Sequence, residues 1–345
     1  MSVTAVGPGR QRVWAAYPKA IVGLLRVPTY LLLLLYYGLG FVAAFGLVKG
    51  GMVWSVGGAG RLLAGALAIA AWYINATALN DLSDYEIDQI NLSDASDRPL
   101  VAGALRRPDL LIIAGTTAVL SLAAAAVLGW WTAGLVAILL AFNTAYSLPP
   151  MSLSRRGGWA LALLPIGYVI LPMMLGLAAT AQGLVALAGP LVAICYAQFV
   201  ARISLKDYRD VVGDAQFGKR TFLLRHGSAV VVRLALLGQI VAGVGGVIWL
   251  YGSSPLMAAG YIFLATIGSV YLQRLGRAAA WPKQRLWISA YGRLATGQVV
   301  ILLLDALARA QLAGGSIRQA VLLAVVVVAF CWSAQQIIRR HQIGG

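Results

Sequence analysis

The stretch ALNDLSDYEIDQINLSDASDRPLVAG, from Ala78 to Gly103, holds six of the eleven acidic residues of this 345-residue chain. They are Asp81, Asp84, Glu86, Asp88, Asp94 and Asp97. A second stretch, KDYRDVVGDAQFGKRT from Lys206 to Thr221, holds Asp207, Asp210 and Asp214. Because 60% of all residues are hydrophobic, the carboxylates of a very apolar chain are gathered almost entirely in two places.

The two stretches share one spacing. Asp81, Asp84 and Asp88 are three and four residues apart, and so are Asp207, Asp210 and Asp214. On a helix such positions lie on one face and cover about 10 Å along the axis. We therefore predict two helical rows of carboxylates, the first and second acidic clusters. Like charges at this spacing destabilise a helix, so a cation is expected between them. Oxygen ligands at this density suit Mg²⁺, which usually binds through a few carboxylates and the phosphates of a substrate.

The rest of the chain is built to cross a membrane. Mean hydropathy is +0.82 and only 11% of the residues are charged, which excludes a pair of soluble domains. Ten apolar stretches are long enough to span a bilayer. They are residues 27–48, 61–81, 109–129, 131–148, 159–180, 184–205, 227–251, 255–274, 286–310 and 317–338. We predict an all-α, polytopic membrane bundle of nine to ten transmembrane helices around a central cavity that opens to the cytoplasmic face.

The positive charge is distributed as in a membrane protein. The net charge of +16 could suggest nucleic acid as a partner. With the N-terminus in the cytoplasm, however, twenty of the 27 Lys and Arg residues fall in inner segments and four in outer ones. This bias fixes the orientation by the positive-inside rule and favours an even number of spans. Both acidic clusters then face the cytoplasm, and no nucleic acid partner is expected.

The ends of the chain are expected to lie outside the catalytic unit. Residues 1–26 are interpreted as a tail and an interfacial helix. Arg26 could reach a phosphate, but a snorkelling anchor of the first span is the favoured role. Residues 27–310 are expected to form the main transmembrane domain. Residues 311–345 are expected to add one more transmembrane helix and a basic tail.

Further polar residues lie at the inner ends of two spans. Asn143 and Tyr146 are one turn apart before Pro149 and Pro150, which end the fourth span. An interfacial Tyr is often a membrane-belt residue, so a belt role and a substrate role both stay open. Arg202 lies inside the sixth span, where a charge is costly unless it faces a cavity or pairs with acids. The second acidic cluster, one to two turns away, offers such acids.

This combination of charges describes a diphosphate site. Two acidic clusters can hold two or more Mg²⁺ ions, and interleaved Arg and Lys can donate charge-assisted hydrogen bonds to phosphate oxygens. A diphosphate with an apolar tail that fits among membrane helices is an isoprenoid diphosphate. Metal ions neutralise the departing diphosphate, so the allylic C–O bond can ionise. The carbocation needs a dry pocket with aromatic walls, for which Tyr146, Trp72 and Tyr73 are candidates.

Three polar motifs lie at the predicted cytoplasmic ends of helices. The first comprises Asn80, Asp81, Asp84 and Asp88, followed by Asp97-Arg98-Pro99-Leu100 and Gly103. The middle motif comprises Asn143, Tyr146, Ser147, Pro149 and Pro150. The last comprises Lys206, Asp207, Asp210, Gly213 and Asp214, with Gly218 and Thr221. Each motif alone is weak, but in this order and at cytoplasmic helix ends the three together closely resemble those of the UbiA superfamily of intramembrane prenyltransferases.

The resemblance implies roles for individual residues. It implies Mg²⁺ as cofactor and transfer of a prenyl group to an acceptor. It implies catalytic roles for Asp84, Asp88, Asp210, Asp214 and Tyr146. Asn80 would join these four aspartates in holding the metal-diphosphate, with Asp81 and Asp207 as supporting metal ligands. We expect substrate-binding roles for Asn80, Arg98, Asn143, Arg202, Lys206, Lys219 and Arg220. Many members carry a Lys shortly after the middle-motif Tyr, whereas this chain has only Arg155 and Arg156 further on, so the acceptor side stays open.

Other functions remain alternatives at this point. The partners expected are an isoprenoid diphosphate, a small aromatic acceptor for a quinone or related lipid, and membrane lipid. An intramembrane terpene cyclase of the same superfamily would ionise the same substrate without an acceptor. An ion-coupled transporter would instead place its ionisable residues near the membrane midplane. The expected location is a bacterial inner membrane, with the active site on the cytoplasmic side.

Overall fold

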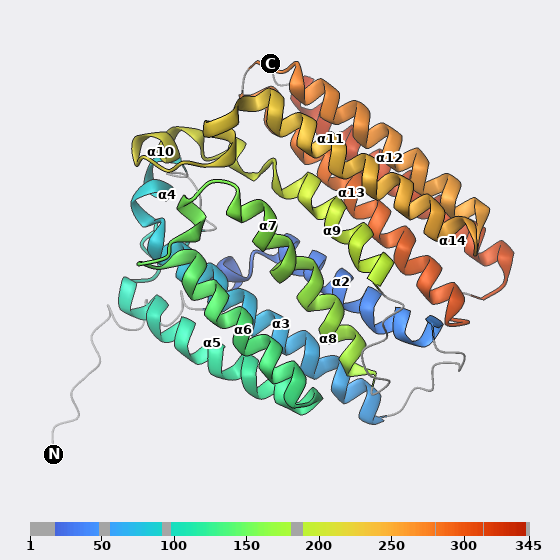
Figure 1. The fold of residues 1–345 in the computed structure, drawn as a ribbon, viewed down its shortest axis with the longest axis horizontal. Helices are drawn as coiled ribbons and strands as arrows, with labels where there is room; N and C mark the ends of the chain where they lie inside the picture. Colours follow the sequence, from blue (N-terminus) through green and yellow to red (C-terminus); the bar gives the residue numbers. More distant parts are fainter. Residues whose placement is uncertain are drawn as a thin grey trace.

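The protein is a bundle of helices in a computed structural model that describes residues 18–47, 56–91, 98–180, 189–279, 281–312 and 314–342 (Figure 1). The described residues contain no strand, which confirms the all-α prediction. The helices are α2 (Val27–Leu47), α3 (Val56–Ser83), α4 (Tyr85–Asn91), α5 (Arg107–Leu128), α6 (Trp130–Ser147), η1 (Leu153–Arg155), α7 (Trp159–Pro165), η2 (Ile166–Ile170), α8 (Leu171–Ala179), α9 (Gly189–Ile203), η4 (Lys206–Tyr208), α10 (Val211–Gln216), α11 (Phe222–Tyr251), α12 (Pro255–Gly276), α13 (Trp281–Arg309) and α14 (Ser316–Gln342).

Eight of the described helices are long and apolar enough to cross a membrane, so the chain is an integral membrane protein. The two other expected spans, 131–148 and 184–205, correspond to α6 and α9. These helices have 18 and 15 residues, and residues 181–188 before α9 lie outside the described ranges. The count of ten spans therefore stays a prediction.

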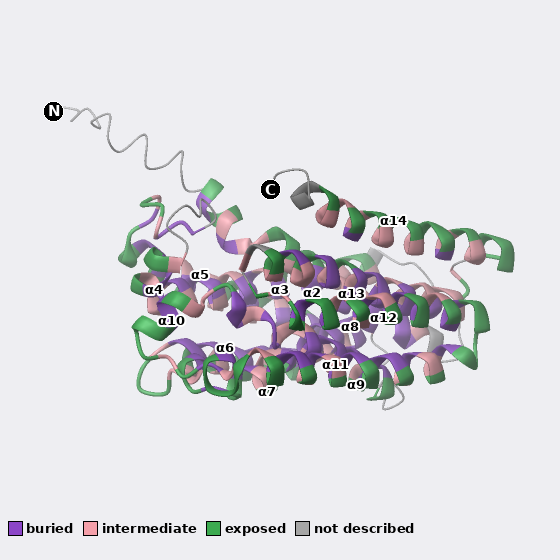
Figure 2. Cartoon of the chain, turned by 90° about the horizontal axis from the view of Figure 1, so that it is seen from above, coloured by how far each residue is buried: buried purple, intermediate pink, exposed green. Residues whose placement is uncertain are grey.

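The helices pack in pairs along the bundle. α3 lies against α5 and α6, α2 against α8 and α13, and α11 between α9 and α12. α14 packs against α13 and α12 at the edge of the bundle, with much of its surface exposed (Figure 2). The division of the chain at residues 26 and 310 stays a prediction.

Small residues allow the closest helix contact. A Cβ on Gly40 of α2 would lie 2.2 Å from the carbonyl oxygen of Met173, and one on Gly176 of α8 would lie 2.2 Å from that of Tyr37. Only glycine therefore fits at either position, as is typical of tightly packed membrane helices. Between α7 and α8, Pro165 precedes a single π-helical turn, η2. Such turns widen a helix and are frequent at functional sites.

The short helices α4 and α10 lie side by side at one end of the bundle (Figures 1 and 2). They carry parts of the two acidic clusters and mark the site. Next to them, residues 18–25 are helical and the chain changes direction at Arg26, where φ is 42°. Most of the expected N-terminal tail and interfacial helix, as well as Asp94 and Asp97, lies outside the described residues.

Candidate active site

The first acidic cluster lies where α3 passes into α4. α3 ends at Ser83, Asp84 occupies a bend, and α4 begins at Tyr85. The Asp84 N–H donates to Asn80 O at 2.9 Å and the Asp88 N–H donates to Asp84 O at 2.8 Å. The helical hydrogen-bond spacing thus continues across the bend. Asp81, Asp84 and Asp88 are all buried.

The second acidic cluster does not lie on one continuous helix, so the predicted helical row is wrong there. α9 ends at Ile203, Asp207 lies in the 3₁₀ turn η4, and Asp210 directly precedes α10. Asp214 lies inside α10. Three like charges on one helical face are unfavourable, and short segments bring Asp207 and Asp214 into buried positions without such a helix.

Lys219 joins the two clusters. Its Nζ lies 3.1 Å from Asp84 Oδ1 and 3.3 Å from Asp214 Oδ1, and its side chain is only 8% exposed. The clusters therefore share one buried basin with the Lys219 ammonium between them, and the Mg²⁺ that the spacing predicted stays a prediction. Arg220, the other candidate at this place, is exposed.

Asn91, at the end of α4, makes a second link between the clusters. Its Nδ2 donates to Asp210 O at 3.0 Å, and its Oδ1 accepts from Gly213 N–H at 2.7 Å. A Cβ on Gly213 would lie 2.7 Å from Asn91 Nδ2, so this close approach requires glycine. Asn91 has no charge and falls outside the repeated spacing, and for that reason the sequence motifs did not point to it.

Most of the carboxylates are paired with basic residues. Asp81 Oδ1 contacts Arg26 Nη2 at 2.5 Å and Arg98 Nη1 at 2.7 Å. In the second cluster, Lys206 Nζ lies 2.7 Å from Asp207 Oδ1, and Arg209 Nε lies 2.8 Å from Asp210 Oδ1. Arg98 and Lys206 are thus at the site, as predicted. Arg26 is an ion-pair partner and not the snorkelling anchor that its position before the first span suggested.

Electrostatic repulsion remains among the acids. Burial and the neighbouring carboxylates raise the pKa of Asp88 to about 7. Burial also raises the pKa of Asp214, against the opposing effect of Lys219. Burial would lower the pKa of Lys219, but Asp84 and Asp214 raise it. More positive charge would therefore be favourable between the clusters.

The donor set fits a hard divalent cation. Asp88 Oδ2 and Asp214 Oδ1 are buried without a hydrogen bond; their nearest cations are Arg98 Nε at 3.7 Å and Lys219 Nζ at 3.3 Å. Asn80, whose Nδ2 donates to Asp84 Oδ2 at 3.3 Å, adds an amide oxygen. Among the described residues, no three His, Cys, Asp or Glu side chains form a ready metal site. Metal binding would therefore involve Asn80, substrate oxygens or small side-chain movements.

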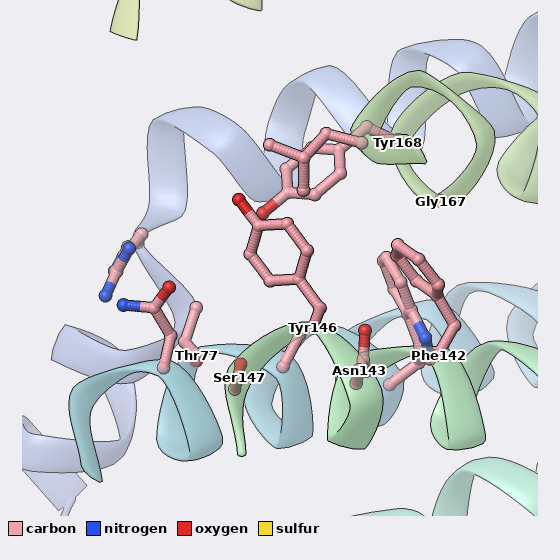
Figure 3. A pocket seen from close by; sticks show the side chains of 12 residues that line it. Thr77, Phe142, Asn143, Tyr146, Ser147, Gly167 and Tyr168 are labelled. Atoms are coloured by element: carbon pink, nitrogen blue, oxygen red, sulfur yellow. The ribbon is translucent and has the colours of Figure 1, made fainter. Parts of the chain in front are cut away.

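A pocket lies inside the bundle between α3, α6 and the π-helical turn, and Asn80, which contacts Asp84, is part of its lining (Figure 3). Its lining includes Arg26, Trp72, Thr77, Asn80, Phe142, Asn143, Tyr146, Leu164 and Tyr168. The rings of Tyr146 and Tyr168 lie close together, with their hydroxyls at the same end of the pocket (Figure 3). Asn143 Nδ2 donates to Asn75 Oδ1 at 3.1 Å. Tyr146, Asn143 and Trp72 thus line the pocket as expected, while Tyr168 was missed because no motif surrounds it.

Arg202 contacts α13, and not the second acidic cluster as its position in the sequence had suggested. Its Nη1 donates to Thr296 Oγ1 at 3.0 Å and to Gly292 O at 3.5 Å, both on α13. The expected pairing with the second acidic cluster is therefore wrong: hydroxyl and carbonyl oxygens of a neighbouring helix accept from this guanidinium. Arg155, by contrast, donates from Nη2 to Ser83 O at 3.1 Å, next to Asp84.

The fold and the site together describe a helical membrane protein with a buried acidic basin beside an aromatic pocket. The model of the UbiA prenyltransferase family matches residues 40–296. The chain belongs to this family, and it is a prenyltransferase.

Curated relatives differ in what their names say they make. The chain is 31% identical over 222 residues to the bacteriochlorophyll synthase 33 kDa chain of Cereibacter sphaeroides. The aligned region covers 63% of this chain and 70% of that protein. It is 29% identical over 204 residues to digeranylgeranylglyceryl phosphate synthase of Thermococcus kodakarensis, covering 56% and 66%. It is 32% identical over 188 residues to homogentisate phytyltransferase of Synechocystis sp., covering 52% and 60%.

Solved structures share the fold. A UbiA homolog from Archaeoglobus fulgidus bound to GPP and Mg²⁺ superposes with a TM-score of 0.60 at 16% identity, over 85% of this chain and 99% of that one. The same protein bound to DMAPP and Mg²⁺ also has a TM-score of 0.60, over 84% and 99%. At this identity the likeness establishes the fold alone.

Proposed function

We propose that this protein transfers a prenyl group from an isoprenoid diphosphate to an acceptor in a reaction that requires Mg²⁺. The observation that carries the proposal is the position of Lys219, whose ammonium contacts Asp84 and Asp214 at 3.1 and 3.3 Å. Two acidic clusters 126 residues apart in sequence thereby share one basin, the arrangement needed to hold a metal-diphosphate from both sides.

The charged and amide residues of the site divide into two roles. Asn80, Asp84, Asp88, Asp210 and Asp214 hold Mg²⁺, with Asp81 and Asp207 in support. Lys219, Lys206 and Arg98 donate to phosphate oxygens. Bound Mg²⁺ supplies positive charge that stabilises the leaving diphosphate. Arg202 and Arg220 are left out of this assignment, because the former contacts α13 and the latter is exposed.

The aromatic pocket receives the apolar part of the substrate. Tyr146, Phe142 and Trp72 line it, and ring faces can stabilise a positively charged allylic group. Burial of the pocket among helices excludes water, which would otherwise capture such a group. Arg26 and Asn80 lie in the same lining and contact Asp81 and Asp84, so the pocket adjoins the first acidic cluster.

For the acceptor, we propose an aromatic compound of quinone or related lipid biosynthesis. The named relatives include a homogentisate phytyltransferase, a bacteriochlorophyll synthase and a digeranylgeranylglyceryl phosphate synthase. Homogentisate, which the first of these names contains, is a small aromatic compound, and this supports an aromatic acceptor. We further propose that the site faces the cytoplasm of a bacterial inner membrane, on the charge asymmetry of the sequence.

The test is incubation of purified protein with labelled geranyl diphosphate, Mg²⁺ and a panel of acceptors that includes homogentisate. We expect a prenylated product and released diphosphate only when Mg²⁺ and an acceptor are both present. A cyclic hydrocarbon formed without acceptor would identify a terpene cyclase. Proton-coupled uptake without any prenyl product would identify a transporter and contradict the proposal.

A further inference from the structure

Helix α10 begins in an unusual way. Asp210 is the residue at its N-cap position, and aspartate there normally accepts a hydrogen bond from the N–H of the second or third helical residue. Here the Asp210 side chain makes no such bond, and its φ and ψ of −104° and 8° lie outside the usual cap conformation. The helix has six residues, too few to be stable without help from elsewhere in the fold.

That help comes from Asn91. Its Oδ1 accepts at 2.7 Å from the N–H of Gly213, the third residue of α10 and one of the N–H groups that lack a partner within a helix. Its Nδ2 donates to the carbonyl oxygen of Asp210 at 3.0 Å. Asn91 thus makes the bond that Asp210 would make as a cap, although it comes from α4.

We propose that Asn91 caps α10 from the neighbouring helix and thereby keeps the Asp210 carboxylate out of the helix cap, so that it stays available to bind the metal-diphosphate. The proposal rests on the proposed function, since it concerns the use of Asp210 in that site. The two Asp210 carboxylate oxygens accept from the exposed Arg209, Oδ1 from Nε at 2.8 Å and Oδ2 from Nη2 at 3.3 Å, and the helix N–H is left to Asn91. Asn91 is therefore a positioning residue: it acts through Asp210 and also ties α4, which carries Asp88, to α10, which carries Asp214.

The Asp210 carboxylate is close enough to cap α10 in place of Asn91. Without the Asn91 amide, the Gly213 N–H would be left buried and unpaired, which is unfavourable. The nearest group that can replace it is the Asp210 carboxylate, already at the cap position. Asp210 would then be withdrawn from the metal, and α10 would lose its two hydrogen bonds to α4.

A double-mutant cycle tests this idea through metal binding. The four proteins are wild type, Asn91→Ala, Asp210→Asn and the double variant, with Gln89→Ala as matched control, because Gln89 is an exposed amide of α4 that contacts Tyr85 of its own helix. Mn²⁺ binding in the presence of geranyl diphosphate is measured by electron paramagnetic resonance. We expect Asn91→Ala to weaken Mn²⁺ binding about 10-fold and Asp210→Asn to have little further effect in that background. Gln89→Ala should bind as wild type does.

A second measurement needs no metal. If Asp210 takes over the cap in Asn91→Ala, then removing the Asp210 side chain changes capping mainly in that background, whereas Asp210→Asn keeps a cap acceptor. Asp210→Ala, which removes every cap acceptor, should lower the melting temperature by about 2 °C in the Asn91→Ala protein and by less in wild type. A purely structural role of Asn91 would give additive effects in both measurements.

The outcomes separate the two proposals. If the wild type bound neither Mn²⁺ nor geranyl diphosphate, the proposed function would be overturned. Normal wild-type binding, with Asn91→Ala unchanged or with additive effects of Asn91 and Asp210, would overturn the capping role alone.

Discussion

The first and second acidic clusters have the same spacing in sequence but are held in different ways. The first cluster lies at the end of a long helix and is fixed by Arg98, whose side chain is 4% exposed. The second cluster lies on short segments, and its partners Lys206 and Arg209 are 32% and 46% exposed. The first cluster is therefore a preformed part of the bundle. The second is docked onto it through Lys219 and Asn91, so the geometry of the basin depends on these two contacts.

The largest effect should come from removing one carboxylate from either cluster. Asp84→Asn or Asp210→Asn should lower prenyl transfer by about 1000-fold, because the developing charge of the diphosphate loses its metal-mediated stabilisation. Initial rates with labelled geranyl diphosphate measure this. Glu86→Gln is the matched control, since Glu86 is an exposed acid of the same stretch, and it should retain wild-type rates. Equal losses in all three would contradict the assignment.

The next effect distinguishes the clusters by stability. Asp81→Asn should lower the free energy of unfolding by about 3 kcal/mol, because it leaves Arg26 and buried Arg98 without their shared partner. Asp207→Asn should cost about 1 kcal/mol, since Lys206 can reach solvent. Unfolding in mixed SDS micelles, followed by circular dichroism, measures both. A larger loss for Asp207→Asn would show that the second cluster is the rigid one.

Replacement of the bridging lysine should weaken the junction of the clusters. Lys219→Met should reduce kcat/KM for geranyl diphosphate by about 100-fold, because a buried charge-assisted contact to phosphate is lost. Arg220→Met removes the adjacent, exposed charge and should change kcat/KM less than about 2-fold. Steady-state kinetics at saturating Mg²⁺ compare the two. If Arg220→Met were the more damaging change, the placement of Lys219 in the basin would be wrong.

The smallest effect is expected for an exposed ion pair. Arg209→Met removes a partner of Asp210 that is 46% exposed, and such pairs contribute about 1 kcal/mol or less. We expect a change in transfer rate below about 3-fold, measured in the same assay. A loss as large as that of Lys219→Met would mean that Arg209 binds the substrate.

Much of this organisation could be predicted from sequence, because it depends on repeated spacing and on charge. The all-α bundle followed from long apolar runs, and the shared basin followed from two acidic rows that each need a cation. The break in the second row could not be predicted, because helix periodicity does not reveal where tertiary contacts replace a helix. Arg26 and Arg202 were misjudged for a related reason: the partners Asp81 and Thr296 lie 55 and 94 residues away.

The roles of neutral side chains could not be predicted from the sequence either. Asn91 and Tyr168 have no charge pattern that separates them from ordinary helix residues. Their roles depend on contacts with Gly213 and with the aromatic pocket, which only the folded chain brings together.

The most direct test of the shared basin is calorimetric titration of the purified protein with geranyl diphosphate, with and without Mg²⁺. Wild type should bind only when Mg²⁺ is present, and binding should be lost in Asp88→Asn, from the first cluster, and equally in Asp214→Asn, from the second. Binding without Mg²⁺, or full binding in either variant, would contradict a metal-diphosphate held jointly by both clusters.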